Sequence, residues 1–186
     1  ATTDSVISVG AYCSRRSYLD WTGQVVSYNN YYPSHIASFS SYGPDERNIQ
    51  RPDVCAPGSV LISSANRYDT VSNRSHWPEA AVENGVSYPY FANRGTSMST
   101  PVVTGAIALM LQVNPWLTTS DVRGVLNRSS LKDEIVAAGN SHQWGSGKLD
   151  IWAALNDAID NTMISGDVNH DGEVNIADVM SIISII

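Results

Sequence analysis

The pattern of apolar and polar positions in the first third of the chain predicts short buried strands. Val6–Ala11 is a β-branched run that ends in small residues, which is typical of a strand in a parallel sheet. Arg51–Gly58 predicts a second brief strand closed by a Pro-Gly turn, and Val60–Ile62 predicts a third. Between the first two strands, residues 15–35 are polar, aromatic and irregular, so we interpret them as a loop.

Beyond Met98 the pattern changes to helices. Residues 98–111 are apolar or small on every side, which predicts a helix buried all round that ends at Asn114 before Pro115. We expect Pro101 to lie in its first turn, where a missing N–H costs little. Gly105 and the alanines beside it predict close packing against the sheet.

Local signals predict three further elements. Asn84-Gly85 lies between two short apolar runs and tolerates positive φ, so a hairpin is expected there. Thr118 and Asp121 predict a capping box, and thus a second helix whose apolar face is Val122, Val125 and Leu126. A third helix is expected over residues 150–159. Strands followed by helices, with one strand of parallel type, favour an α/β fold.

Composition narrows the possible functions. The chain of 186 residues has a net charge of −7, which argues against nucleic acid as a partner because phosphate binding needs clustered Lys and Arg. No apolar run reaches the ~18 residues of a membrane span, so no span is predicted. Cys13 and Cys55 fit no metal spacing, and we expect two buried free thiols in preference to a disulfide.

The most informative segment is Gly95–Pro101, which reads Gly-Thr-Ser-Met-Ser-Thr-Pro. It places Ser97 where a turn entered through glycine becomes the N-terminus of the apolar helix. Backbone N–H groups at a helix N-terminus have no acceptor within the helix, and the helix dipole there favours negative charge. A serine in this position can attack a carbonyl carbon while its own N–H helps to hold the oxyanion.

These residues resemble the subtilisin-like serine proteases, peptidase family S8. Four further blocks occur in the family's order, namely residues 5–11, 38–44, 51–58 and 145–155. The resemblance implies a C-terminal portion of a subtilisin-like parallel-sheet peptidase domain over residues 1–160. It also implies a serine-type endopeptidase that hydrolyses peptide bonds of peptide or protein substrates through an acyl-enzyme on Ser97.

The resemblance covers the nucleophile but not its partners. In this family the catalytic Asp and His precede the Ser. His35 and His76 lack the family's sequence context, and neither Asp4 nor Asp20 matches its Asp motif. The side-chain oxyanion donor also belongs upstream of the first block. We therefore expect this chain to be nearly inactive alone and to need an N-terminal protease half, with strand edges left exposed in its absence.

A second motif lies near the end of the chain. Residues 167–178 offer oxygen ligands in EF-hand spacing with a glycine at the sixth position, which predicts calcium bound by Asp167, Asn169, Asp171, Glu173, Asn175 and Asp178. An acidic, solvated turn is the alternative. Asp in place of Glu at the twelfth position resembles the dockerin type I repeat. After the loop, Val179, Ile182, Ile183 and Ile186 fall on one helical face.

The second resemblance implies an EF-hand-like calcium-binding unit over residues 161–186, as the first half of a dockerin whose partner would be a cohesin-like protein. Three readings of the whole chain stay open: a protease fragment, a non-catalytic calcium-dependent binding or scaffold module, and one chain of a processed two-chain protease. Both resemblances imply an extracellular or secreted protein. Aromatic residues within residues 66–94 either line a substrate cleft or pack on one another.

Overall fold

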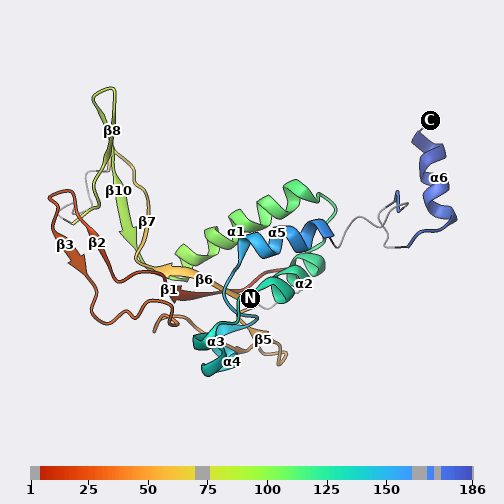
Figure 1. Cartoon of the computed structure of the whole chain (residues 1–186), viewed down its shortest axis with the longest axis horizontal. Helices are drawn as coiled ribbons and strands as arrows, with labels where there is room; N and C mark the ends of the chain where they lie inside the picture. Colours follow the sequence, from red (N-terminus) through yellow and green to blue (C-terminus); the bar gives the residue numbers. More distant parts are fainter. Residues whose placement is uncertain (1–4, 70–75, 161–166, 170–172, 186) are drawn as a thin grey trace.

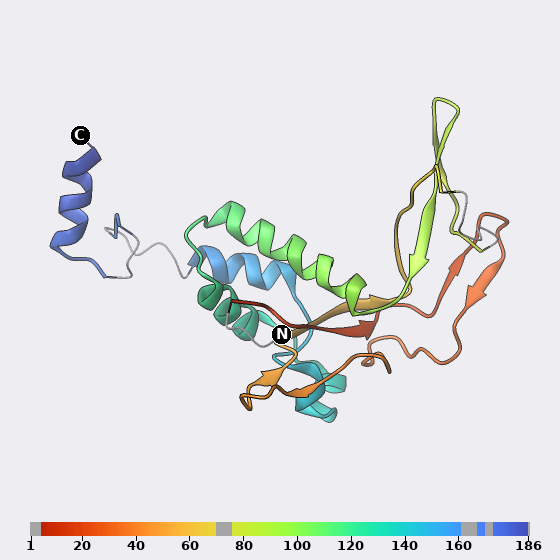
Figure 2. The ribbon, with the colours of Figure 1, turned by 180° about the vertical axis from the view of Figure 1, so that it is seen from behind.

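The fold is built on two parallel strands and the helices that cover them. The computed structural model describes residues 5–69, 76–160, 167–169 and 173–185. Strand β1 (Val9–Cys13) pairs in parallel with β6 (Val54–Ser59), with Val9 opposite Val54. Helices α1 (Thr96–Val113) and α5 (Ile151–Asp160) lie side by side along this pair, and α2 (Thr119–Ser129) contacts α5 (Figures 1 and 2). The predicted α/β class and the parallel pairing are confirmed.

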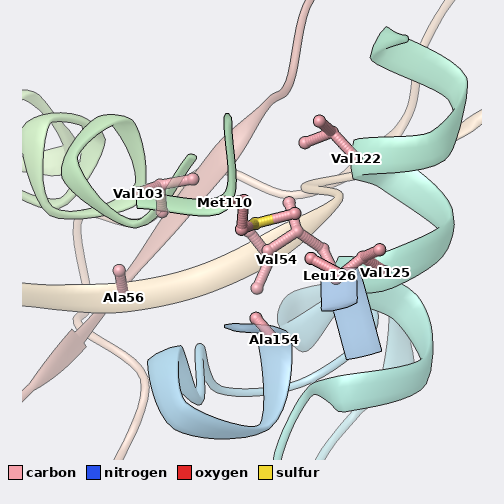
Figure 3. Packing of buried hydrophobic residues seen from close by; sticks show 9 residues of the cluster. Val54, Ala56, Val103, Met110, Val122, Val125, Leu126 and Ala154 are labelled. Atoms are coloured by element: carbon pink, nitrogen blue, oxygen red, sulfur yellow. The ribbon is translucent and has the colours of Figure 1, made fainter. Parts of the chain in front are cut away.

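The core forms where the three helices meet β6. Figure 3 shows Met110 of α1, Leu126 of α2 and Ala154 of α5 converging around Val54, and all four side chains are buried. The predicted apolar face of α2 is buried as well, and its N-terminus carries the predicted capping box: the Asp121 N–H donates to Thr118 Oγ1, and Asp121 Oδ2 accepts the Thr118 N–H at 2.8 Å. The predicted α5 is also confirmed.

Helix α1 differs from its prediction in two respects. Only one stripe is buried, formed by Ser99, Val103, Ala106 and Met110, whereas Leu109 is 43% and Val113 42% exposed. Gly105 lies on the open side, where a Cβ would meet nothing within 4 Å, so its predicted packing against the sheet is wrong. Because the helix begins at Thr96, Pro101 is its sixth residue, and the Ser97 carbonyl therefore lacks its i+4 donor.

The strands that surround the core carry two further corrections. Residues 15–35 hold an antiparallel hairpin, β2 (Ser17–Leu19) and β3 (Val25–Ser27), in place of the predicted loop. Pro57 and Gly58, which were predicted to form a turn, belong to strand β6. The chain bends instead at Val60, whose φ is 54°. The expected third strand is β7 (Leu61–Ser64), which pairs with β10 (Tyr90–Asn93).

The hairpin predicted at Asn84-Gly85 is confirmed. Strands β8 (Ala81–Glu83) and β9 (Val86–Tyr88) are antiparallel, and the two turn residues have φ of 51° and 77°. Minor elements complete the chain: β4 (Gly43–Pro44), β5 (Gln50–Arg51), α3 (Glu134–Ala138), α4 (Ser141–Trp144) and α6 (Ile176–Ile185). Cys13 and Cys55 are buried free thiols, as predicted, and burial raises the pKa of the Cys55 thiol to about 12.

By length and composition, α1 is the single helix of the described residues that could cross a membrane. Its buried stripe lies against β1, β6 and α5, which assigns it to the core of the domain. The edges of the parallel pair are covered over part of their length. Ala37 donates its N–H to the Ala11 carbonyl on one side, and Cys55 donates to the Gly147 carbonyl on the other. The exposed edges of β1 and β6 are therefore shorter than predicted.

One buried carboxylate joins three separate segments of the domain. Asp53 accepts hydrogen bonds from the Ser8 N–H at 2.6 Å, from Arg51 Nη1 at 2.8 and 2.9 Å, and from Arg123 Nε at 3.0 Å. Its side chain is 8% exposed, and that of Arg51 is 9% exposed. Asp53 thus ties the segment before β1 to β6 and α2.

Candidate active site

Ser97 lies where strand β10 passes directly into helix α1 (Figures 1 and 2). The turn between them depends on Gly95, whose φ of 143° and ψ of 159° suit glycine alone. Gly95 is the N-cap residue, so Ser97 is the second residue of the helix. The sequence prediction of a glycine-entered turn at a helix N-terminus is therefore correct in geometry.

Strand β6 holds this turn in place. The Gly95 N–H donates to the Gly58 carbonyl at 2.7 Å, and the Gly95 carbonyl accepts the Met98 N–H at 2.9 Å. A Cβ on Gly58 would lie 2.3 Å from Ser99 Oγ and 2.6 Å from Ala11 Cβ, so any side chain there would push the turn away from the sheet. The start of α1 thus packs so closely on the parallel pair that no side chain fits at Gly58.

Ser97 is exposed, and among the described residues neither its Oγ nor its N–H has a hydrogen-bond partner. An N–H at the second position of a helix has no acceptor within the helix, so it can donate to an oxyanion. Within the described residues, Ser97 thus presents a hydroxyl and an N–H, both without partners, at the N-terminus of α1.

No histidine of the described chain contacts Ser97. His35 Nδ1 lies 3.1 Å from the Pro33 carbonyl oxygen, and the His142 ring hydrogen-bonds with Gln50 Oε1. His76 Nδ1 lies 3.7 Å from Asp20 Oδ2. All three rings face groups other than the serine, which agrees with the mismatch of sequence context at His35 and His76.

The pair of Asp20 and His76 was missed by sequence reasoning because 56 positions separate the two residues. Asp20 is 3% exposed, and hydrogen bonds, the largest of them from the Thr22 hydroxyl, keep the pKa of its carboxyl below the ordinary value. The pair fastens the β2–β3 hairpin to the segment at Trp77, whose carbonyl accepts the Trp21 N–H. In both views this hairpin lies apart from the start of α1 (Figures 1 and 2).

The aromatic residues of 66–94 include one packed pair and two exposed side chains. Trp77 is buried, and its ring lies 5.4 Å from that of Phe91 in a tilted arrangement, so these two pack on one another. Tyr68 is 72% exposed and Tyr88 46% exposed, and the β8–β9 hairpin extends away from the helices (Figure 1). Packing within the segment 66–94 thus explains the positions of Trp77 and Phe91.

The predicted calcium loop is described in part, because Asp171 lies outside the described residues. Asp178 is 3% exposed and accepts the backbone N–H groups of Asn175 at 2.8 Å, Val168 at 2.7 Å and Asn169 at 3.2 Å. The Asn175 bond contributes most to holding the pKa of this carboxyl below its ordinary value. Glu173 and Asn175 are exposed, and Asp167 and Asn169 half-buried. In the described part of the chain, no three His, Cys, Asp or Glu side chains form a metal-holding group.

Comparisons with known proteins agree with this geometry. Residues 1–147 match the model of the subtilase family, Peptidase_S8. Serine protease AprX of Bacillus subtilis is 39% identical over 99 residues, covering 52% of this chain and 21% of AprX. Fervidolysin of Fervidobacterium pennivorans is 31% identical over 102 residues, covering 55% of this chain and 14% of that protein.

A solved structure extends the likeness to the fold. The crystal structure of fervidolysin, titled a keratinolytic enzyme related to subtilisin, aligns with a TM-score of 0.51 at 26% identity. The alignment covers 82% of this chain and 19% of the fervidolysin chain, so this chain spans about a fifth of its relative. With the family model matched across most of the length and Ser97 at the strand-to-helix turn, the chain belongs to the subtilase family of serine proteases.

Proposed function

We propose that this chain provides the nucleophile and one oxyanion donor of a serine endopeptidase. The observation that carries the proposal is the position of Ser97 at the start of α1, where its exposed hydroxyl and its N–H have no partner among the described residues. In the reaction, Ser97 Oγ attacks the peptide carbonyl carbon and gives its proton to a base. The leaving amine takes that proton, and water then releases the acyl group.

The base and its orienting carboxylate come, in this proposal, from a protease segment other than the described residues. Two observations support a partner segment. The relatives are much longer than this chain, which spans 21% of AprX. The outward faces of the core helices are also apolar and open: Leu109 of α1 is 43% exposed, and Trp152 of α5 is 74% exposed. Apolar surface of this kind marks an interface.

We therefore assign residues 1–160 to the C-terminal portion of the peptidase domain, and we infer that peptide or protein chains outside the cell are the substrates. The N-terminal half can be joined to this chain or can be a separate chain of a processed protease. In both cases its buried face is expected to cover α1 and to bring a histidine to Ser97.

Labelling of the serine tests the proposed function. We expect a fluorophosphonate probe to leave this chain essentially unlabelled and to label the natural protein, including any residues that precede Ala1, at Ser97. Without a base, a serine hydroxyl is a weak nucleophile. Intact mass and peptide mapping measure the adduct, with Ser97→Ala as the control. Labelling of the isolated chain that disappears in Ser97→Ala would contradict the need for a second segment, and an adduct on another serine would contradict the nucleophile.

We further propose that residues 161–186 bind calcium as a dockerin-like unit and dock a cohesin-like partner. The donor set fits the ion, since Asp167, Asn169, Asp171, Glu173, Asn175 and Asp178 provide only hard oxygens. The observation in favour is the buried Asp178 carboxylate, which is turned back onto Val168 and Asn169 at the start of the loop. The apolar face of α6 gives the partner its surface, as Val179 is 47% and Ile183 58% exposed.

Calorimetry with calcium chloride tests this unit. We expect one site per chain, and we expect Asp167→Asn to weaken it by about tenfold or more, because affinity in such loops follows the number of charged ligands. Glu79→Gln removes an exposed carboxylate outside the loop and serves as the matched control. Equal affinity of Asp167→Asn and the unchanged chain would refute the ligand assignment.

A further inference from the structure

Arg94 lies next to the proposed nucleophile in the sequence and has no role in the reaction proposed for Ser97. It is exposed and stands three residues before Ser97, so the two Cα atoms are at most about 11 Å apart. A bound peptide in extended form advances about 3.3 Å per residue. Any group that Arg94 binds on such a peptide therefore lies within a few residues of the carbonyl presented to Ser97.

The guanidinium is held by two tyrosines of the segment 15–35. Arg94 Nη1 donates to Tyr31 Oη at 2.7 Å, and its Cζ lies 5.7 Å from the Tyr31 ring and 5.9 Å from the Tyr28 ring. The two tyrosine rings are half-buried and lie 5.8 Å apart. A guanidinium fixed in this way loses little freedom when it forms another hydrogen bond.

Arg94 lines two small cavities. One, of about 190 Å³, is lined by Tyr28, Asn29, Asn30, Tyr31, Ser38 and Arg94. The other, of about 160 Å³, is lined by Tyr28, Val60, Ala92, Asn93 and Arg94. Neither lining contains an acidic residue, although the whole chain carries a net charge of −7.

Arg94 has no carboxylate partner in the described part of the chain, whereas Arg51, Arg123 and Arg128 each have at least one. With Nη1 committed to Tyr31, the edge formed by Nε and Nη2 is free. That edge presents two parallel N–H groups, which is the geometry that binds a carboxylate through both oxygens.

We propose that Arg94, held by Tyr28 and Tyr31, is a carboxylate-binding subsite that selects peptides with an acidic group near the bond presented to Ser97. The subsite gives a substrate class to the proposed function and rests on it. The carboxylate is either an Asp or Glu side chain or the C-terminal carboxylate of the peptide, and both present the same pair of oxygens.

Titration of the whole chain, followed by the ¹⁵N signal of the Arg94 Nε–H group, tests the subsite without turnover. The probes are the end-blocked tripeptide Ala-Asp-Ala, its Ala-Asn-Ala counterpart and Ala-Ala-Ala with a free carboxyl end. We expect the carboxylate probes to bind about five- to tenfold more tightly than Ala-Asn-Ala, because charge-assisted hydrogen bonds are roughly twice as strong as neutral ones. A response to Ala-Asp-Ala identifies side-chain acids, and a response to the free carboxyl end alone identifies chain termini.

Two variants sharpen the test. Tyr31→Phe is expected to weaken the carboxylate probe by about fivefold, since it removes one hydrogen bond that positions the guanidinium. The Nε–H signal of Arg67, whose guanidinium lies over the Tyr68 ring within the segment 66–94, is the internal control and should not move. Equal binding of the Asp and Asn peptides, or equal shifts at Arg94 and Arg67, would overturn the subsite. Failure of the protease assignment would appear instead in the labelling of Ser97.

Discussion

Replacing Ser97 by alanine is expected to reduce kcat by about a million-fold in the natural protein with its full complement of catalytic groups. This magnitude is the one known for the nucleophile of subtilisin, a member of the same family, and it corresponds to about 8 kcal/mol of activation free energy. The physical reason is that no acyl-enzyme can form without Oγ, so only binding and oxyanion stabilisation remain. Hydrolysis of a casein substrate, followed to the background rate, measures the effect.

A matched variant separates chemistry from folding. Thr104→Ala removes a hydroxyl from the same helix, where Thr104 Oγ1 donates to the Thr100 carbonyl on the exposed side. We expect Thr104→Ala to keep full turnover and the same thermal midpoint. If Ser97→Ala retained more than about a thousandth of the activity, a different nucleophile would have to be sought.

Replacing Asp53 by alanine is expected to lower the free energy of unfolding by about 3 kcal/mol or more. The change leaves the Ser8 N–H without its acceptor and the buried Arg51 guanidinium with only the longer contact to Asp45 at 3.6 Å, and breaking a buried ion pair from one side is costly. It also releases Arg123 and thus loosens α2 from β6. Urea denaturation followed by tryptophan fluorescence measures the shift in midpoint.

A surface pair in the same domain provides the control for Asp53. Arg128 and Asp157 join α2 to α5 at 2.8 Å, but the Arg128 side chain is 54% exposed. Asp157→Ala is therefore expected to cost less than about 1 kcal/mol. Equal losses of unfolding free energy from Asp53→Ala and Asp157→Ala would show that the burial of Asp53 adds nothing to the stability of the domain.

Elements specified by neighbouring residues could be predicted from the sequence. The capping box of Thr118 and Asp121 and the hairpin at Asn84-Gly85 depend on residues at most three positions apart. The β2–β3 hairpin was missed because its pairing is supported from a distance, where Trp21 donates its N–H to the Trp77 carbonyl. Burial around α1 was overestimated because an apolar composition does not reveal which faces this chain covers by itself.

The candidate site likewise combines features set by neighbouring residues with features set by distant ones. The place of Ser97 follows from a contiguous motif, in which Gly95 provides the turn and the following residues provide the helix. The surroundings of Arg94 could not be predicted, because Tyr28 and Tyr31 approach it from more than sixty positions away, within a segment that sequence patterns indicated to be irregular. The assignment of calcium ligands remains a prediction from spacing.

The hydrogen bond between the Gly95 N–H and the Gly58 carbonyl fixes the turn at Ser97 directly to strand β6. The position of this turn therefore does not depend on the segment that connects Gly58 to Gly95. The chain leaves strand β6 after Ser59 and returns to it at Gly95, so the two ends of the segment 60–94 are fixed at one point of the sheet. Insertions or exchanges within that excursion therefore leave the serine in register with the core. The segment 60–94 can therefore vary in length and sequence, or accept an engineered graft, without moving Ser97 relative to the sheet.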